Sequence, residues 1–285
     1  MSFKNTFRGG VHPPDEKEYS KDAPIQTPPL PGNVVIPLQQ HIGAPAEAVV
    51  KKGDLVKTGQ LIGTASGFVS VPVHASVSGK VTGVKPLPHP LGGKLTAVTI
   101  ESDGNDEPAA SWEEQDAYLS LSPDEMKKRI QDAGIAGLGG AAFPTHVKLS
   151  PPKDKPIDTL ILNGVECEPF LTSDYRLMLE NPEYIFKGLD IIKKILGLEE
   201  AVIGIEKNKP DAIRLLKEKT DGDRSTSIVS LEVKYPQGAE KQLIKAVTNR
   251  EVPSGGLPMD VGCLVQNVGT AAAVYEAVAR QKPLI

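Results

Sequence analysis

The second half of the chain alternates between short continuous apolar runs and segments whose apolar residues lie three or four positions apart. The continuous runs have the length and β-branched content of buried strands, and they are 158–163, 201–205 and 227–233. The spaced pattern is typical of amphipathic helices, and it is found at 182–196, around 213–216 and at 240–247. Alternating strands and helices predict βαβ units around a largely parallel sheet. We therefore expect an α/β domain over residues 121–285.

The first part of the chain has a different pattern. Residues 1–32 are rich in proline and glycine, which predicts an extended segment running across other domains. Short β-branched runs separated by glycine follow between residues 33 and 101, and they are 33–37, 52–56, 59–63, 68–71 and 77–81. Strands of this length with glycine turns predict a small all-β sandwich or barrel. The polar, acidic residues 102–120 are interpreted as a linker.

Length and composition narrow the class of protein. With 285 residues, 39% of them apolar, the chain has room for two globular domains. Its net charge of −4 and dispersed basic residues argue against a nucleic-acid partner. No apolar run reaches the roughly 18 residues of a membrane span, and the N-terminus lacks a signal-peptide core, so we expect a soluble, intracellular chain. The chain ends directly after a predicted helix, which suggests part of a longer protein.

Metal chemistry is not expected within this chain. Cys167 and Cys263 lie far apart in the sequence and form no C-x-x-C pair, so a cysteine-only zinc or iron–sulfur site is excluded. His12 has no second histidine or cysteine nearby, and packing or solvent exposure explains it better than metal binding.

Residues 134–148 form a glycine-rich segment that ends in Lys148. Its three central glycines, Gly137, Gly139 and Gly140, carry no Cβ, so their bare amides with Lys148 could cradle a phosphate. A helix C-cap followed by a tight turn is an equally compatible interpretation. The G-x-G-x-x-A spacing also fits a dinucleotide-binding fingerprint, which requires a preceding strand. Here a capping box at residues 122–125 predicts a preceding helix instead.

Two polar, turn-prone segments follow predicted strands. Residues 163–169 leave the first strand and residues 235–240 leave the third. Taken alone, Glu166 and Glu168 in the first segment are compatible with a solvated loop. Ligands of parallel sheets bind beyond the carboxyl ends of the strands, so the position of both segments favours a binding site there.

Four segments, in this order along the chain, together resemble one family. They are Gly137-Leu-Gly-Gly-Ala-Ala-Phe-Pro-Thr-His-Val-Lys148, Asn163-Gly-Val-Glu-Cys-Glu-Pro169, Tyr235-Pro-Gln-Gly-Ala-Glu240 and Val265-Gln-Asn-Val-Gly-Thr270. The first resembles the glycine-rich loop of the flavin-bearing, NADH-oxidising subunit of respiratory complex I. The others resemble that subunit's Asn-Ala-Asp-Glu-Gly-Glu-Pro, Tyr-x-x-Gly-Glu-Glu and Val-Asn-Asn-Val-Glu-Thr segments.

The N-terminal part narrows the resemblance. Residues 7–14, Phe-Arg-Gly-Gly-Val-His-Pro-Pro, and a lipoyl/biotinyl-like pattern at 50–61 and 76–81 are similar to the RnfC family of Rnf electron-transport complexes. The similarity covers essentially the whole chain. It implies a barrel-sandwich-hybrid domain followed by a Rossmann-like parallel-sheet FMN/NADH module. Carrier proteins with such a barrel place a lysine in the intervening hairpin, and residues 64–74 contain none, which disfavours a biotin or lipoate carrier.

The resemblance implies a role for each matching residue. Glu166 and Glu168 would line the nicotinamide position as candidate catalytic residues. The implied cofactor-binding residues are Gly137, Gly139, Gly140, Phe143, Lys148, Asn163, Tyr235, Gly238, Glu240, Asn267 and Thr270. The glycines and Lys148 would surround FMN and its phosphate, and Phe143 would stack on the adenine of NADH. Asn163 would hydrogen-bond the flavin, Asn267 and Thr270 would hold its phosphate side, and Glu240 would meet a ribose hydroxyl.

The function implied by the resemblance is hydride exchange between NAD(H) and FMN in a membrane-bound, ion-translocating ferredoxin:NAD oxidoreductase complex. Family members continue into a small β domain and two [4Fe–4S] clusters that this chain lacks. Other Rnf subunits would be its partners and would hold it peripherally on the cytoplasmic face of the membrane. The alternative is a cofactor-free scaffold on which partner subunits dock.

This sequence departs from the family pattern at three positions. Val165 stands where an acidic residue is usual, Ala239 replaces the first glutamate of the third segment, and Gln266 replaces the first asparagine of the last. Each change removes or alters a polar partner for flavin or NADH.

Overall fold

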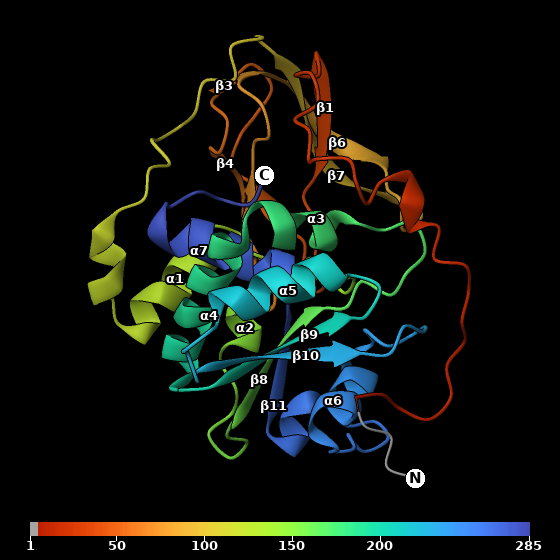
Figure 1. The fold of residues 1–285 in the computed structure, drawn as a ribbon. Helices are drawn as coiled ribbons and strands as arrows, with labels where there is room; N and C mark the ends of the chain where they lie inside the picture. Colours follow the sequence, from red (N-terminus) through yellow and green to blue (C-terminus); the bar gives the residue numbers. More distant parts are fainter. Residues whose placement is uncertain (1–4) are drawn as a thin grey trace. The chain divides into compact units, whose positions relative to one another are not determined.

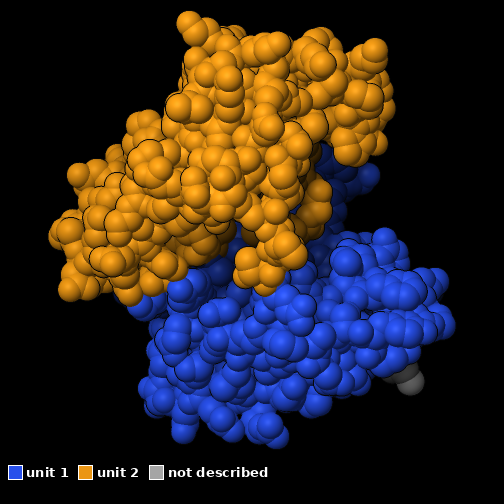
Figure 2. Space-filling model, turned by 90° about the horizontal axis from the view of Figure 1, so that it is seen from above, with its two compact units in different colours: residues 1–26, 150–272 blue, residues 27–149, 273–285 orange. Residues whose placement is uncertain are grey.

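The computed structural model describes residues 5–285, and the chain divides into two compact units (Figure 2). Unit 1 comprises Met1–Gln26 and Ser150–Ala272, and unit 2 comprises Thr27–Leu149 and Ala273–Ile285. Each unit therefore combines two stretches of sequence. The N-terminal segment belongs with the α/β half of the chain, and the glycine-rich segment belongs with the barrel.

Unit 1 is built on a four-stranded parallel sheet with strand order β10-β9-β8-β11 (Figure 1). Its strands are β8 (Thr159–Gly164), β9 (Ala201–Glu206), β10 (Thr226–Leu231) and β11 (Cys263–Asn267). Its helices are η1 (Lys17–Tyr19), α3 (Ser173–Glu180), α4 (Pro182–Leu196), α5 (Pro210–Lys219), α6 (Glu240–Thr248) and η3 (Pro258–Val261). Helix α7 (Val268–Ala279) begins in this unit and ends in unit 2. The expected α/β architecture is confirmed.

Both faces of this sheet are covered, which explains the uninterrupted apolar runs of its strands. Ile161 of β8 and Val265 of β11 pack in one cluster with Leu243 and Ile244 of α6. Helices α4 and α5 lie on the other side of the sheet from α6 (Figure 1). The pattern of apolar residues missed β11, whose apolar run is only Cys263–Val265, and extended the third predicted strand two residues past the end of β10.

Unit 2 contains the barrel, made of two small antiparallel sheets. One has the order β1 (Asn33–Pro37), β7 (Lys94–Ser102), β6 (Gly79–Pro88) and β3 (Leu55–Val56). The other has the order β2 (Glu47–Ala48), β4 (Leu61–Thr64) and β5 (Val73–His74). Their inner faces share one apolar core that includes Ile62, Val81 and Val98.

The prediction of a strand at residues 68–71 is wrong. These residues form bends and an irregular stretch, and pairing resumes only at β5. Two serine hydroxyls take the place of ladder bonds here: Ser66 Oγ donates to the Pro45 oxygen at 2.6 Å, and Ser70 Oγ donates to the Ala44 oxygen at 2.8 Å. Such side-chain bonds to the backbone compete with strand pairing.

The polar segment interpreted as a linker is partly packed on the barrel. Thr58 Oγ1 donates to Asp106 at 2.6 Å, and the main chain of Thr58 pairs with residues 107–109. Further along lie η2 (Asp116–Ser120), α1 (Pro123–Asp132) and α2 (Thr145–Lys148).

No helix in residues 5–285 combines the length and apolar character required to cross a bilayer.

The capping box that predicts α1 is present. Ser122 Oγ accepts from the Glu125 amide at 3.3 Å, and Glu125 accepts from the Ser122 amide at 2.7 Å. Gly134 ends the helix with φ +71°, in the left-handed conformation that a C-cap glycine supplies. A Cβ at this position would lie 2.5 Å from the Pro72 oxygen of the barrel, so glycine is required for packing as well.

Candidate functional site

The carboxyl ends of the four parallel strands in unit 1 meet at one edge of the sheet. Two of the segments that leave this edge contain those predicted from the sequence, 163–169 at the end of β8 and 235–240 after β10. Helix α7 follows β11 directly, and residues 207–209 follow β9. All predicted site residues outside the glycine-rich segment therefore belong to this edge.

Asn163 and Asn267 are neighbours at the ends of β8 and β11, where they form a register pair. Each asparagine organises its own strand exit. Asn163 donates to the Gly238 oxygen at 2.9 Å and accepts from the Val165 amide at 3.1 Å. Asn267 accepts from the Thr270 amide at 3.1 Å, in the first turn of α7. Two predicted site residues from distant motifs are thus adjacent.

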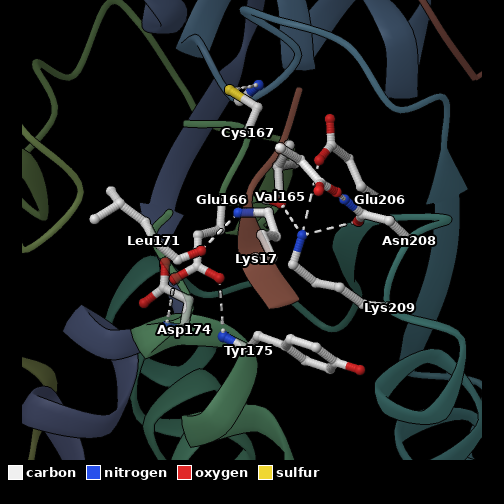
Figure 3. Close-up of polar contacts among 12 residues, drawn as sticks. Lys17, Val165, Glu166, Cys167, Leu171, Asp174, Tyr175, Glu206, Asn208 and Lys209 are labelled. Carbon is white, nitrogen blue, oxygen red and sulfur yellow. Dashed lines mark hydrogen bonds and ion pairs between the residues drawn. The ribbon is translucent and has the colours of Figure 1, made fainter. Parts of the chain in front are cut away.

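Glu166 is buried and caps helix α3 (Figure 3). Its carboxylate accepts from the amides of Asp174 at 2.8 Å and Tyr175 at 3.3 Å, and from the Ser173 hydroxyl at 3.3 Å. This is the usual stabilisation of a helix N-terminus by an anion. Glu166 also has φ +49°, an uncommon backbone conformation for glutamate. Glu168, two residues on, is exposed and available to a ligand.

Asp174 links the α3 cap to the end of β11. Asn267 Nδ2 donates to Asp174 Oδ2 at 2.6 Å. Burial, and secondly the neighbouring Glu166 carboxylate, raise the pKa of Asp174 to about 7, against the lowering effect of the Asn267 hydrogen bond. The carboxyl group therefore changes its charge near neutral pH.

The exit of β9 carries a buried ion pair that sequence reasoning missed. Glu206 and Lys209 are both 0% exposed, and their charged atoms lie 3.7 Å apart. Lys209 Nζ also donates to the Val165 oxygen at 2.7 Å and to Asn208 at 3.1 Å (Figure 3). Burial raises the pKa of Glu206 to about 7 and lowers the pKa of Lys209. The available signal was the Glu-Lys-Asn-Lys run between a predicted strand and helix.

The exit of β10 is tied to the exit of β8 through Gly238. Besides accepting from Asn163, Gly238 donates its amide to Cys167 Sγ at 3.3 Å. Burial raises the pKa of the Cys167 thiol, so it stays protonated at neutral pH. Tyr235 is partly exposed, precedes a cis peptide bond to Pro236 and pairs with Val11. Glu240 lies in the first turn of α6 and is half-buried.

Two of the departures from the family pattern, Val165 and Ala239, lie at the strand exits of unit 1. Val165 is fully buried in the same apolar cluster as Leu243 and Ile244, so this position supplies core packing instead of a carboxylate. Ala239 is the N-cap residue of α6, where it offers no side-chain acceptor. In the same segment, Gln237 is 0% exposed, and none of the described residues accepts a hydrogen bond from its Nε2.

The predicted residues of the glycine-rich segment belong to unit 2. The Gly137 amide donates to the Phe143 oxygen at 2.9 Å, which closes the segment into a loop between α1 and α2. Gly140 has φ +118° with open space around its Cα, whereas Gly137 lies outside the left-handed region. Phe143 and Lys148 are half-buried, and Lys148 ends α2. The loop is held by the barrel, since the Ile42 amide donates to the Ala142 oxygen at 3.1 Å.

The structure therefore forms two hydrogen-bonded groups in unit 1: Asn163 with Gly238, and Asp174 with Glu166, Asn267 and Thr270. The register pair of Asn163 and Asn267 makes the two groups neighbours. Gly137, Gly139, Gly140, Phe143 and Lys148 form a second group in unit 2. No group of three or more His, Cys, Asp or Glu side chains suited to a metal ion is found in residues 5–285.

Comparison with known proteins assigns each half of the chain to a family. Residues 5–105 match the RnfC barrel sandwich hybrid domain, and residues 130–276 match the Nuo51 FMN-binding domain. A solved structure of an NAD+-reducing [NiFe]-hydrogenase in the H2-reduced state aligns with 57% of this chain and 31% of that chain. That alignment has 25% identity and a TM-score of 0.48.

Two curated relatives match almost the full chain. The C subunit of the proton-translocating ferredoxin:NAD(+) oxidoreductase complex of Clostridium ljungdahlii is 54% identical over 98% of this chain and 61% of its own length. The Na(+)-translocating counterpart of Acetobacterium woodii is 50% identical over 100% of this chain and 64% of its own length. The chain thus spans less than two thirds of either relative. Together, the barrel, the parallel-sheet unit and these matches show that the chain belongs to the RnfC family, with a Nuo51-type FMN-binding domain after the barrel sandwich hybrid.

Proposed function

We propose that this chain is the flavin- and nicotinamide-binding part of an electron-transfer subunit in an ion-translocating ferredoxin:NAD oxidoreductase complex. In this role it exchanges hydride between NAD(H) and FMN, and electrons pass to [4Fe–4S] clusters in a further part of the subunit. The observation that carries the proposal is the adjacency of Asn163 and Asn267 at the carboxyl ends of β8 and β11. These asparagines come from two separate family motifs, and this edge is where parallel sheets bind ligands.

The residues present fit FMN and NAD(H). The donor set is polar and uncharged where a flavin ring would need hydrogen bonds, with side-chain amides at Asn163, Asn267 and the buried Gln237. Gln237 Nε2, which has no hydrogen-bond partner among residues 5–285, lies in the Tyr235–Glu240 segment and is a donor that a ligand could use. In unit 2, Gly140 leaves room for a phosphate next to bare amides, and Lys148 supplies a positive charge.

Bound FMN would supply the hydride chemistry at its N5 atom and one-electron transfer onward. The protein's part is binding and orientation. In unit 1, Asn163 would hold the flavin, and Asn267 and Thr270 would contact its phosphate side. In unit 2, Gly137, Gly139, Gly140 and Lys148 are the residues that we propose for phosphate binding. Glu168 and Glu166 would border the nicotinamide. Tyr235, Gly238 and Glu240 would line the NADH ribose. In unit 2, Phe143 is the residue that we propose for stacking on adenine. Since Glu166 already caps α3, we expect Glu168 to make the more direct contact.

The whole complex is part of the same proposal. We expect the other subunits of the complex to be partners that hold this chain at the cytoplasmic face of the membrane. None of the segments assigned to FMN or NADH is expected to enter the bilayer.

A direct test is a titration of this chain with FMN, followed by flavin fluorescence and absorbance, and then anaerobic addition of NADH. Saturable FMN binding followed by bleaching of the flavin absorbance on NADH addition is the expected result. If no FMN binds even at large excess, the flavin site is not self-contained in this chain, and a cofactor-free docking scaffold becomes the better interpretation. If FMN binds but NADH does not bleach it, the nicotinamide half of the proposal is wrong.

A further inference from the structure

The N-terminal segment, residues 5–26, lies along the strand ends of unit 1 and contacts both predicted exit segments. Val11 and Tyr235 exchange two main-chain hydrogen bonds of 2.8 Å, which attach the segment to the exit of β10. The Phe170 amide donates to the Asp15 oxygen at 2.9 Å, which attaches it to the exit of β8. A segment whose sequence predicts an extended arm is thus bound to the candidate site of its own unit.

Lys17 attaches the segment to unit 1 through a buried side chain. It lies in η1, and only 4% of it is exposed. Its ammonium donates to the Leu171 oxygen at 2.6 Å (Figure 3). It also donates to the Glu168 oxygen at 3.0 Å. Hydrogen bonds from a charged donor are stronger than neutral ones, and a buried ammonium needs such partners. One side chain therefore spans the loop from Glu168 to Leu171.

The loop needs to be held because its backbone is strained. Glu166 has φ +49° and Phe170 has φ +69°, and neither is glycine. Side chains adopt these conformations only where surrounding contacts enforce them. Three contacts surround Phe170. Its amide donates to the Asp15 oxygen, and the Lys17 ammonium binds the oxygens of Glu168 before it and Leu171 after it. The Tyr19 ring stacks on the Phe170 ring, with 6.2 Å between the centroids.

The two ends of the exit segment are held by different groups. Lys209 binds the Val165 oxygen, and the amides of α3 bind the Glu166 carboxylate. Beyond them, Lys17 binds the residues from Glu168 to Leu171. We therefore expect loss of the Lys17 ammonium to loosen the part of the loop that carries Glu168 and to leave Val165 and Glu166 in place.

We propose that Lys17 is a positioning residue for NADH, which fixes the backbone that presents Glu168 to the nicotinamide. The N-terminal segment is then a functional part of the NADH site, although it lies far from the motifs in the sequence. This inference rests on the proposed function, because it takes Glu168 to be a nicotinamide contact.

The test compares Lys17→Met, which keeps the length of the side chain and removes its donors, with Lys17→Arg, which keeps them. Lys21→Met is the matched control, because it makes the same change in the same segment and no described residue accepts a hydrogen bond from the Lys21 ammonium. The Kd of FMN, the KM for NADH and the kcat of NADH-dependent reduction of an artificial acceptor are measured for each. Hydrogen exchange of the Phe170 and Leu171 amides is followed in the same proteins.

We expect Lys17→Met to raise the KM for NADH about tenfold with little change in kcat or in the Kd of FMN. Its Phe170 amide should exchange faster, while the amides of Asp174 and Tyr175 at the α3 cap keep their protection. Lys17→Arg should restore most of the affinity for NADH, and Lys21→Met should behave like the wild type. Tyr19→Ala, at a position that is 74% exposed, is a milder second variant should Lys17→Met not fold, with a smaller rise in the same KM.

The measurements distinguish failure of the Lys17 positioning role from failure of the proposed function. If the wild type reduces FMN with NADH and both Lys17→Met and Tyr19→Ala do so with unchanged KM, the positioning role is wrong and the proposed function stands. An equal loss of FMN and NADH binding in Lys17→Met, without rescue by arginine, would mean a general structural role and would also overturn the inference. If the wild type binds FMN but no NADH, the proposed function fails and the inference fails with it.

Discussion

The ammonium of Lys209 donates to the main-chain oxygen of Val165 at 2.7 Å, and both residues are fully buried. This bond connects the exit of β9 to the exit of β8, so two neighbouring strand ends hold each other. The same ammonium is the countercharge of Glu206, at 3.7 Å. A buried lysine is therefore a structural support of the candidate site.

Removing that ammonium should destabilise unit 1 strongly. Lys209→Met leaves the Val165 oxygen and the buried Glu206 carboxyl without their cation, which we expect to cost about 3 kcal/mol of unfolding free energy at pH 8. Glu206→Gln in the same chain should recover ~1–2 kcal/mol of that loss, because no buried charge remains. Urea unfolding of the two single variants and the double variant gives the coupling energy. Strictly additive losses would show that the two groups do not interact.

Asp174 should make stability depend on pH. Its pKa in the folded protein, about 7, lies above the ordinary value of 3.8. Between these values the folded state binds the proton more tightly than the unfolded state, so stability is lost as the pH rises through this window. Glu206, whose pKa is also raised to about 7, acts in the same direction.

Replacement of Asp174 by asparagine isolates the contribution of this carboxyl group to the pH dependence of stability. Of the loss in unfolding free energy between pH 5 and pH 8, Asp174→Asn should abolish about 2 kcal/mol. Asp221→Asn, on an exposed turn after α5, is the control and should keep the pH dependence of the wild type. Denaturant unfolding at several pH values measures the effect, and an unchanged slope in Asp174→Asn would contradict it.

The glycines that follow α1 and α4 allow the cost of backbone strain to be distinguished from the cost of a steric contact. Gly134 and Gly197 have almost the same φ, +71° and +68°, after α1 and α4. A Cβ at Gly197 would meet nothing within 4 Å, whereas one at Gly134 would lie 2.5 Å from the Pro72 oxygen. We expect Gly197→Ala to cost about 1 kcal/mol and Gly134→Ala about 3 kcal/mol. Thermal and urea unfolding test this, and equal costs would show that the contact with the barrel relaxes freely.

Phosphate binding by the glycine-rich loop is tested by two variants with one control. Lys148→Ala removes a positive charge, and Gly139→Val places side-chain atoms near bare amides, so each should weaken FMN binding about tenfold. Lys153→Ala removes an equal charge from an exposed turn and should leave the Kd of FMN unchanged. Fluorescence titration measures the three constants. Should all three variants bind FMN as the wild type does, the loop would not be the phosphate site.

Local pattern was sufficient for much of the fold. Continuous apolar runs predicted β8, β9 and β10, and spaced apolar residues predicted α4, α5 and α6. These elements could be predicted because the periods of strands and helices depend on residues that are close together in the sequence. The capping box at Ser122 predicted the start of α1 for the same reason. The pattern was wrong at residues 68–71, where serine hydroxyls bind the backbone, and it missed β11, in which Gln266 and Asn267 cut the apolar run to three residues.

The sequence by itself determined the βαβ and barrel classes, the exits of β8 and β10 as candidate binding segments, and the glycines that turns require. Only the tertiary structure decided that β11 pairs with β8, which makes Asn163 and Asn267 neighbours. It also decided that Lys209 and Glu206 are buried together and that Lys17 crosses to the loop of Glu168. Strand pairing and burial of charge depend on partners far away in the chain, and no short-range periodicity encodes them.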